Sequence, residues 1–273
     1  SFTVNPQRQT FHCFGCGKGG DVFKFVMEHE NIAFMEAVRM LAQRAGVALQ
    51  LDRTEPGEEG RKEQLYALHE KACRFYQDVL RNHAAAEAAR AYLKRRDLGP
   101  DLVEAFGLGY APDLQDVTVR FGQKHDFPRD VLETSGLLAR SEDGRFYDRF
   151  RDRLMFPIRD LSGRIIAFSG RILEKDASPA KYLNSPETPI FRKGKVLYAM
   201  DQARKAVIEA RTCILCEGQI DVIRCHAAGI RNTVAGLGTA ITEDHARLIK
   251  RNADAVILVM DADTAGQNSA MRS

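Results

Sequence analysis

Apolar and polar positions alternate in blocks through the last quarter of the chain. Short apolar runs at 212–216 and 255–260 predict strands, because runs of this length bounded by polar residues are typical of strands buried within a sheet, and 231–235 is a third strand candidate. The stretches between them, 220–228 and 242–252, have the spacing of amphipathic helices. Such alternation favours a βαβαβ unit with a parallel sheet.

The middle of the chain follows a different pattern. Apolar positions at helical spacing over about 62–82 and 85–96 predict two helices. Two apolar runs, 154–160 and 164–173, are separated by a turn at Gly163 and resemble a β-hairpin with arginines on both flanks. This part of the chain is therefore expected to form an α+β subdomain.

The first fifty residues are organised differently again. A polar, glycine-rich start is followed by apolar residues at helical spacing from Val22 to Gly46, and 47–51 predicts a short strand. The next stretch, 52–61, is charged and contains Pro56 and two glycines, which is typical of an interdomain linker.

These patterns divide the chain into four segments and predict an α/β fold class. We expect an N-terminal unit over 1–51, a linker at 52–61, an α+β unit over 62–205 and a parallel βαβαβ sheet over 206–273. A chain of 273 residues exceeds the usual size of one domain, so more than one hydrophobic core is expected.

Charge is unevenly distributed along the chain. The net charge of +3 is too small to argue for a polyanionic partner. Residues 140–205, however, contain fifteen Lys and Arg against nine Asp and Glu, so this stretch carries +6 and the remainder carries −3. The longest aliphatic run, 255–260, is far shorter than the roughly 20 residues that span a bilayer, and no membrane helix or membrane partner is expected. Six Cys in so long a chain favour a reducing compartment.

Three carboxylates follow strands of the predicted parallel sheet. Glu217 comes directly after the first strand, and Asp261 and Asp263 come directly after the third. Ligands of an open parallel sheet bind outside the carboxyl ends of its strands, so these side chains should face one crevice. Oxygen-rich clusters suit Mg²⁺ or Mn²⁺, and a pair of such ions can hold both reacting oxygens of a phosphoryl transfer. The Gly-Leu-Gly-Thr segment at 236–239 would line the same crevice and let backbone approach a phosphate.

Each acidic residue also has a plainer interpretation. Acidic side chains at turns between strands and helices often only cap the helix, and that reading is open for any one of the three. Asp221, four residues after Glu217, falls inside the predicted helix, where capping or exposure to solvent is expected, with a supporting role at the metal site as the alternative.

Two Cys-x-x-Cys pairs carry different expectations. Cys13 and Cys16, with glycines at 15 and 17, have the spacing of one half of a zinc site, although a redox-active or an incidental pair has the same spacing. Cys213 and Cys216 lie on a predicted strand, where residues three apart point to opposite faces, so packing is expected for both.

Several stretches together resemble the DnaG-type primases of bacteria. They are KYLNSPETPIFRKG at 181–194, RFRDRLMFPI at 149–158 and HCFGCGKGGDVFKFVM at 12–27, the last of which is similar to the second half of the family's zinc ribbon. The Glu-Gly and Asp-x-Asp-x-Ala-Gly segments resemble the TOPRIM fold over about 212–273. All of them occur in the order of the family, so the resemblance covers nearly the whole chain.

The resemblance implies roles for individual residues. Glu217, Asp261 and Asp263 would be catalytic and bind Mg²⁺ or Mn²⁺, while Cys13 and Cys16 would bind Zn²⁺, with two further ligands expected before Ser1. Phosphate contacts need cations. The candidates for binding nucleic acid or nucleotide are Arg96, Arg149, Arg151, Arg153, Arg171, Lys181 and Lys193.

The activity implied by the resemblance is RNA primer synthesis on single-stranded DNA by metal-dependent nucleotidyl transfer. The implied partners are the single-stranded template, ribonucleoside triphosphates, the RNA–DNA hybrid and, through a region outside this sequence, the replicative helicase. The implied location is the cytoplasm of a bacterium, at the replication fork. The sequence departs from the family at Gln219, where tyrosine is common, and a further acidic motif is expected beyond Ser273, so the fragment is expected to be incomplete for activity.

Two other functions compete with primer synthesis. A TOPRIM nuclease or topoisomerase would cleave DNA without ribonucleotides. A zinc-ribbon binding module would hold single-stranded DNA equally well without Mg²⁺.

Overall fold

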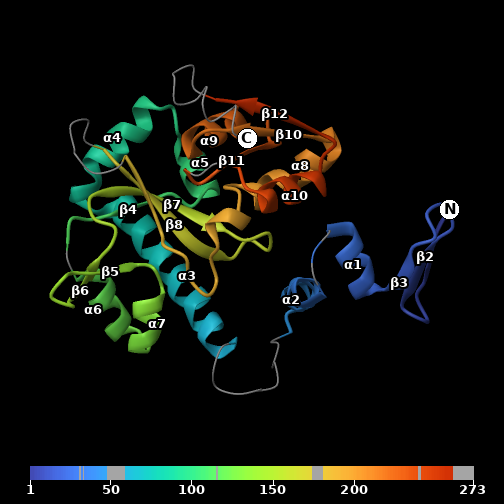
Figure 1. Ribbon diagram of the computed structural model, residues 1–273, viewed down its shortest axis with the longest axis horizontal. Coiled ribbons are helices and arrows are strands. Elements are labelled where there is room, and N and C mark those ends of the chain that lie inside the picture. The colour runs from blue at the N-terminus through green and yellow to red at the C-terminus, as the bar shows by residue number, and fades with distance from the viewer. Residues whose placement is uncertain are drawn as a thin grey trace. The chain divides into compact units, whose positions relative to one another are not determined.

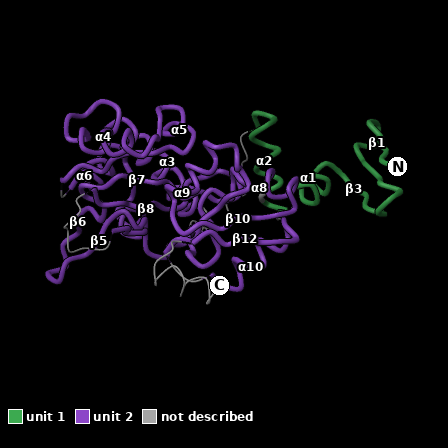
Figure 2. Tube along the Cα trace, turned by 90° about the horizontal axis from the view of Figure 1, so that it is seen from above, with its two compact units in different colours: residues 1–55 green, residues 56–273 purple. Residues whose placement is uncertain are grey.

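The chain forms two compact units, residues 1–55 and 56–273, which Figure 2 shows in different colours. The computed structural model describes residues 1–30, 32, 34–47, 59–114, 116–173, 181–238 and 241–260. The division between the units falls inside the linker predicted at 52–61, whereas the boundary predicted between 205 and 206 stays a prediction. The predicted strand at 47–51 lies outside the described residues except for Val47, which is not in a strand.

The first unit is a small antiparallel sheet followed by helices. β1 (Phe2–Asn5) pairs with β2 (Thr10–Cys13), and β2 pairs with β3 (Gly19–Asp21). The ring of Phe11 lies against those of Phe2 and Phe25, which gives this sheet a small aromatic core. The apolar spacing predicted from Val22 to Gly46 forms two helices, α1 (Val22–Glu30) and α2 (Phe34–Ala45).

A four-stranded sheet and a long helix form the first part of the second unit. Helix α3 (Glu59–Asn82) crosses the sheet β4–β7–β8–β9 (Figure 1). β7 and β8 pair antiparallel from the pair Arg153 and Ile172 onward, so the predicted hairpin is present. The other elements here are α4 (Glu87–Arg95), α5 (Pro100–Ala105), β4 (Gly109–Ala111), α6 (Val117–Lys124), α7 (Arg129–Thr134), β5 (Leu138–Arg140), β6 (Phe146–Asp148), β7 (Arg153–Arg159), β8 (Ile165–Ile172) and β9 (Tyr182–Asn184).

Strand β7 is apolar along most of its length because both of its faces are buried. Leu154, Phe156 and Ile158 belong to one hydrophobic core, whereas Met155, between them, belongs to a second core that includes Phe168 of β8. Successive side chains of a strand point to opposite faces, which explains why neighbours in the sequence enter different cores. The hairpin therefore joins the two cores of this unit.

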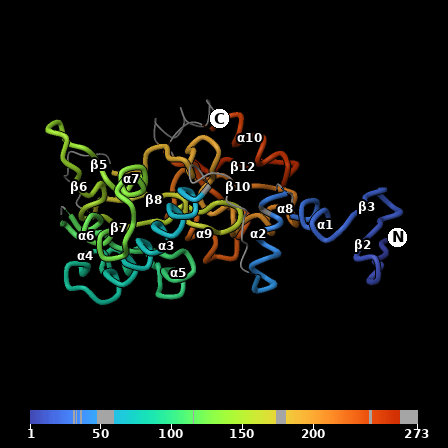
Figure 3. Tube along the Cα trace, turned by 90° about the horizontal axis from the view of Figure 1, so that it is seen from below, coloured from blue at the N-terminus to red at the C-terminus, as the bar shows by residue number. Residues whose placement is uncertain are grey.

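The second part of this unit is a parallel sheet in the order β11–β10–β12, whose neighbouring strands β10 and β12 are also labelled in Figure 3. The predicted alternation of strand and helix is confirmed. Cys216, at the end of β10, lies opposite Ala235 of β11 and Val259 of β12. The elements are α8 (Met200–Ala210), β10 (Thr212–Cys216), α9 (Gln219–Ala227), β11 (Thr233–Ala235), α10 (Glu243–Lys250) and β12 (Ala255–Val259).

The two sheets share a hydrophobic core. Cys216, Ile220 and Ala235 pack in the same cluster as Leu154 and Phe156 of the hairpin, which holds the parallel sheet against the antiparallel one. Cys213 is buried in a different cluster. The two cysteines of β10 thus enter different cores, as expected for strand residues three apart.

Candidate functional site

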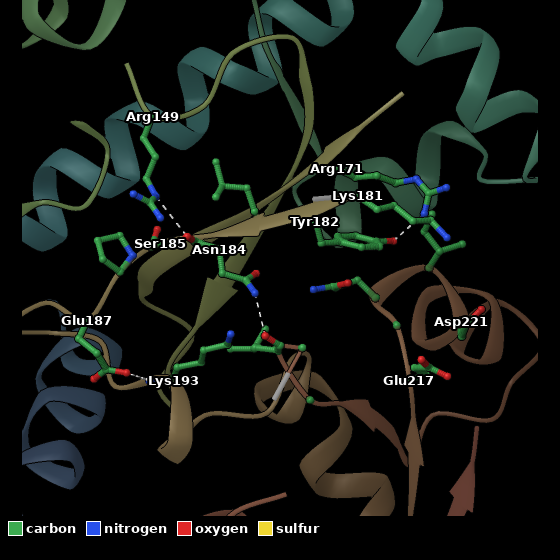
Figure 4. Close-up of a pocket in the computed structure, with 18 of the residues that line it drawn as sticks. Arg149, Arg171, Lys181, Tyr182, Asn184, Ser185, Glu187, Lys193, Glu217 and Asp221 are labelled. Carbon is green, nitrogen blue, oxygen red and sulfur yellow. Dashed lines mark hydrogen bonds between the residues drawn. The ribbon is translucent and has the colours of Figure 1, made fainter. Parts of the chain in front are cut away.

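A pocket of about 810 Å³ lies where the two sheets of the second unit meet. Its walls come from β9, from the turn at Lys193–Lys195, from the loop after β11 and from the start of α9. The loop after β11 and the start of α9 both follow carboxyl ends of strands in the parallel sheet, where ligands of such sheets bind. Figure 4 shows the side chains that line this pocket.

Basic side chains dominate the wall formed by the antiparallel part. The five that line the pocket are Arg96, Arg149, Arg171, Lys181 and Lys193. They come from segments far apart in the sequence, between the end of α4 and the turn after β9. Three acidic residues, Glu187, Glu217 and Asp221, also line it, so the charged side chains leave the pocket positive. Such a pocket attracts phosphate groups.

Arg171 is the most enclosed of these cations. Its side chain belongs to a residue only 9% exposed, and its guanidinium lies 5.3 Å from the ring centroid of Tyr182. Its Nη1 donates to the hydroxyl of Tyr182, 3.0 Å away (Figure 4). Burial raises the pKa of Tyr182, which keeps its hydroxyl protonated at neutral pH. The guanidinium of Arg171 is thus fixed at the edge of the pocket.

Asn184 joins the two halves of the pocket and was not foreseen as a site residue. Its Nδ2 donates to the carbonyl of Leu237, 2.7 Å away, and its own carbonyl accepts from Nε of Arg149 at 3.2 Å (Figure 4). Its Oδ1 is buried and has no partner among the described residues. Two features of the sequence bear on Asn184: it falls in the stretch 181–194 that resembles the primase family, and it lies two residues after Tyr182, on the same face of β9.

Gly236, Leu237 and Gly238 line the pocket as the Gly-Leu-Gly segment was expected to do. Gly238 has φ of +71°, a left-handed conformation that glycine adopts without strain. Thr239, the last residue of the expected segment, lies outside the described residues.

Lys193 is held through its main chain. Its N–H donates to Oε1 of Glu187 at 2.7 Å, and its carbonyl accepts from Nε2 of His245, 3.2 Å away. Burial lowers the pKa of the Lys193 ammonium below its usual value. Fixing the backbone on both sides directs this lysine toward the pocket (Figure 4).

Glu217 and Asp221 lie on the opposite side of the pocket, at the end of β10 and the start of α9 (Figure 4). Gly218 precedes the first turn of α9, so the positive end of that helix also faces the pocket. Gln219 is 4% exposed, and its Nε2 donates to Oγ of Ser169 on β8 at 3.2 Å, which ties the start of α9 to the hairpin. Asp261 and Asp263 lie outside the described residues.

Two of the cations predicted to bind nucleic acid, Arg151 and Arg153, do not line the pocket. Arg151 pairs with Asp113, with Nε 3.1 Å from Oδ1. Arg153 is 6% exposed, and its Nη1 donates to the carbonyl of Gly170 at 3.0 Å. Arg153 therefore stabilises the hairpin from the face away from the pocket.

Cys13 and Cys16 lie at a tight turn of the first unit. The turn is closed by the N–H of Gly17, which donates to the carbonyl of Cys13 at 2.8 Å. Hydrogen bonds from the main chain and the thiol of Cys16 lower the pKa of Cys13, which favours the thiolate that metals bind. In the described part of the chain, no group of three or more His, Cys, Asp or Glu side chains could hold a metal ion. The turn thus offers two donors suited to zinc, half of a four-ligand site.

Three family descriptions match successive parts of the chain. "CHC2 zinc finger" matches residues 1–56, "DNA primase catalytic core, N-terminal domain" matches 75–204, and "Toprim domain" matches 211–273. Zinc-finger and Toprim domains imply that the chain binds divalent metal. No helix in the described ranges is long and apolar enough to cross a membrane.

Curated and solved proteins agree with these matches. A DNA primase from Halalkalibacterium halodurans is 45% identical over 100% of this chain, which covers 46% of that primase. The zinc-binding and RNA polymerase domains of the Aquifex aeolicus primase are 36% identical, with a TM-score of 0.70, over 99% of this chain and 64% of that one.

A third relative is the RNA polymerase domain of the Mycobacterium tuberculosis primase DnaG, solved with a double-stranded DNA oligomer that has a 6-nucleotide overhang. It is 32% identical, with a TM-score of 0.71, over 77% of this chain and 67% of that one. The chain thus spans about half the length of the curated relatives it matches, and most of the solved domains. It belongs to the DnaG-type family of bacterial DNA primases.

Proposed function

We propose that this chain binds the template and the nucleotide in an enzyme that synthesises short RNA primers on single-stranded DNA. The observation that carries the proposal is the convergence of five basic side chains and Glu217 on one pocket at the strand ends of the parallel sheet. Cations contact phosphates, and a carboxylate at this position suits a catalytic metal. The relatives named DNA primase are about twice as long as this chain, so activity, substrates and partners all belong to the proposal.

The basic wall would bind phosphates of the template, of the incoming ribonucleoside triphosphate and of the RNA–DNA hybrid. Arg149, Arg171, Lys181 and Lys193 are the main candidates, with Arg96 beside Arg171. The DNA overhang in the Mycobacterium tuberculosis complex supports single-stranded template as the ligand. Arg153 would contribute by stiffening β7 and β8 rather than by touching phosphate.

The acidic side of the pocket would hold Mg²⁺ or Mn²⁺. Glu217 and Asp221 offer carboxylate oxygens there, and β12 ends at Val259, opposite Cys216, the residue before Glu217. In the sequence Asp261 follows Val259 by two residues, so it would lie near the same strand ends as Glu217. A bound divalent ion would offset phosphate charge as a 3′-hydroxyl attacks the α-phosphate and pyrophosphate leaves. Glu217 would bind that ion or accept the hydroxyl proton, and Asp263 would complete the carboxylate set.

The first unit would hold Zn²⁺ through Cys13 and Cys16. Their tight turn and the lowered pKa of Cys13 support this assignment, and two further ligands would complete a four-ligand site. A replicative helicase would be contacted by a region that this sequence does not contain.

Ribonucleotide incorporation on single-stranded DNA tests the proposal. The natural gene product that carries this chain is assayed with Mg²⁺ or Mn²⁺, as wild type and as Glu217→Gln, with Glu243→Gln as the matched control, because Glu243 is an exposed acid paired with Arg247 on α10. We expect primers from wild type and Glu243→Gln only, with single-stranded DNA binding unchanged in Glu217→Gln. A folded wild type that makes no primers on several templates would overturn the proposal, and DNA cleavage without ribonucleotides would favour a nuclease.

A further inference from the structure

Tyr92 lies behind the basic wall of the pocket, and its ring faces two of the arginines in that wall. Tyr92 belongs to α4 and is 6% exposed. The Cζ atom of Arg171 lies 4.9 Å from the ring centroid, and that of Arg96 lies 5.5 Å from it. Arg171 comes from β8, whereas Arg96 directly follows α4. The Cζ atom of Arg95, which does not line the pocket, lies 6.0 Å from the same centroid. The ring of Tyr92 therefore contacts two pocket arginines that come from separate parts of the fold.

Arg96 and Arg171 have no acidic partner in the described part of the chain, where no carboxylate oxygen lies within 4.0 Å of a nitrogen of either guanidinium. Asp97, the acidic neighbour of Arg96 in the sequence, pairs instead with Arg224 at 2.8 Å. Two positive charges held side by side repel each other. A carboxylate placed between them would relieve this repulsion, but it would also neutralise the positive charge that attracts a phosphate.

Aromatic rings offer a different kind of support. The face of a tyrosine ring attracts a guanidinium without neutralising it. Arg171 has such a face on two sides, from Tyr92 and from Tyr182 at 5.3 Å. Its Nε is buried without a partner among the described residues. The rings thus hold a largely dehydrated cation at the pocket and leave its charge available for an anion.

The hydroxyl group of Tyr92 takes no visible part in this arrangement. It is buried and has no hydrogen-bond partner in the ranges that the structure describes. Any role of Tyr92 must then come from its ring, which distinguishes it from Tyr182, whose hydroxyl accepts from Arg171.

We propose that Tyr92 is a positioning residue whose ring holds Arg96 and Arg171 together as a phosphate-binding pair. The phosphates are those of the single-stranded template or of the nucleotide, so the inference rests on the proposed function. Tyr92 does not line the pocket and acts only through the two arginines.

The test is the binding of a fluorescent single-stranded oligonucleotide at several salt concentrations. Tyr92→Phe keeps the ring and should bind within about twofold of wild type. Tyr92→Leu removes the ring and should bind roughly tenfold more weakly, the effect expected for one or two desolvated cation–π contacts. The slope of log K against log salt should become shallower by about 0.7 for each phosphate that the variant no longer neutralises. If Tyr92→Leu does not fold, Tyr92→Met takes its place.

A double-mutant cycle separates positioning from general stability. Arg171→Lys keeps the charge but not the flat guanidinium that stacks on the rings, so it should weaken binding about as much as Tyr92→Leu. The double variant should bind no more weakly than either single variant, because both remove the same interaction.

Tyr66→Leu is the matched control. The ring of Tyr66 lies 4.0 Å from Cζ of Arg164, which pairs with Asp160, and none of the three lines the pocket. This variant should lose stability but bind DNA as wild type does. The inference would be overturned if Tyr92→Leu bound the oligonucleotide with the affinity and salt dependence of wild type. It would also be overturned if the losses of binding free energy in Tyr92→Leu and Arg171→Lys were fully additive in the double variant. A wild type that neither binds single-stranded DNA nor makes primers would instead overturn the proposed function.

Discussion

His245 donates from Nε2 to the carbonyl of Lys193 at 3.2 Å and thereby links the start of α10 to the wall of the pocket. The same N–H also faces the carbonyl of Val196 at 3.1 Å. The other ring nitrogen, Nδ1, accepts from the N–H of Thr242 at 3.3 Å, where it completes the cap of α10. Because one nitrogen donates and the other accepts, the imidazole must be neutral, and burial accordingly lowers its pKa.

Replacing this histidine should affect both stability and binding. His245→Phe fills the space but leaves the carbonyls of Lys193 and Val196 without their donor, so the free energy of unfolding should fall by about 2 to 4 kcal/mol. Affinity for single-stranded DNA should fall with it, because Lys193 loses one of its main-chain anchors. Urea unfolding and oligonucleotide titration measure the two effects.

His226→Phe is the control for this prediction. Nε2 of His226 also donates to a main-chain carbonyl, that of Thr233 at 2.9 Å, but His226 does not line the pocket. We expect a loss of stability without a loss of affinity. Equal losses of affinity in both variants would show that His245 acts only through stability.

The two lysines of the Lys193–Lys195 turn should differ in their effects on binding. Lys193 lines the pocket, whereas Lys195 is exposed and lies 3.8 Å from Asp244. Lys193→Ala should therefore weaken single-stranded DNA binding by about 1 kcal/mol or more and make its salt dependence shallower, while Lys195→Ala should bind nearly as wild type. Fluorescence anisotropy at two salt concentrations distinguishes them. Equal losses of affinity in Lys193→Ala and Lys195→Ala would show that only the net charge of the protein affects binding.

The sequence was sufficient to predict the parallel sheet and the place of Glu217. Short apolar runs identify β10 and β12, and β11 lies between the two amphipathic stretches that separate them. The carboxyl ends of such parallel strands meet at one edge of the sheet. The position of Glu217 follows from this geometry alone.

The sequence could not separate Arg153 from Arg171. Both lie on the hairpin in similar surroundings, but Arg171 pairs with Leu154, on the face of β7 toward the core shared with the parallel sheet, whereas Arg153 lies one residue earlier and belongs to the other face. The pairing of β7 with β8 shifts register between Ile158 and Arg159, and a shift of one residue reverses the face of every side chain beyond it, so counting from the turn at Gly163 does not identify the partners. The role of Asn184 depends in the same way on Leu237, 53 residues away in the chain.

His69 should make the stability of the second unit depend on pH. It is fully buried on α3, and Nε2 donates to the carbonyl of Ser135 at 2.9 Å. Burial lowers its pKa from 6.5 to about 4. Above pH 6.5 the histidine is neutral in both the folded and the unfolded chain. As the pH falls from 6.5 toward 4, the unfolded chain takes up a proton that the folded chain refuses, so stability decreases.

The predicted decrease is about 3 kcal/mol, since each pKa unit corresponds to about 1.4 kcal/mol. Urea unfolding of wild type and His69→Phe at pH 7.5, 6, 5 and 4.5 measures it. Carboxylates also titrate in this range and affect both proteins alike. The relevant quantity is therefore the free energy of unfolding of wild type minus that of His69→Phe, and this difference should become smaller as the pH falls. If the free energies of unfolding of wild type and His69→Phe change by the same amount with pH, the prediction is wrong.

Zinc content should depend on the turn that holds Cys13 and Cys16. Cys13→Ser and Cys16→Ser each remove one thiolate, and a site with three remaining ligands binds zinc much more weakly, so the metal content of the purified natural gene product should fall well below that of wild type. Cys73→Ala is the control, because Cys73 is a buried thiol of the second unit, 3% exposed. It should lose stability and keep its zinc. Full zinc content in Cys13→Ser would exclude Cys13 as a ligand.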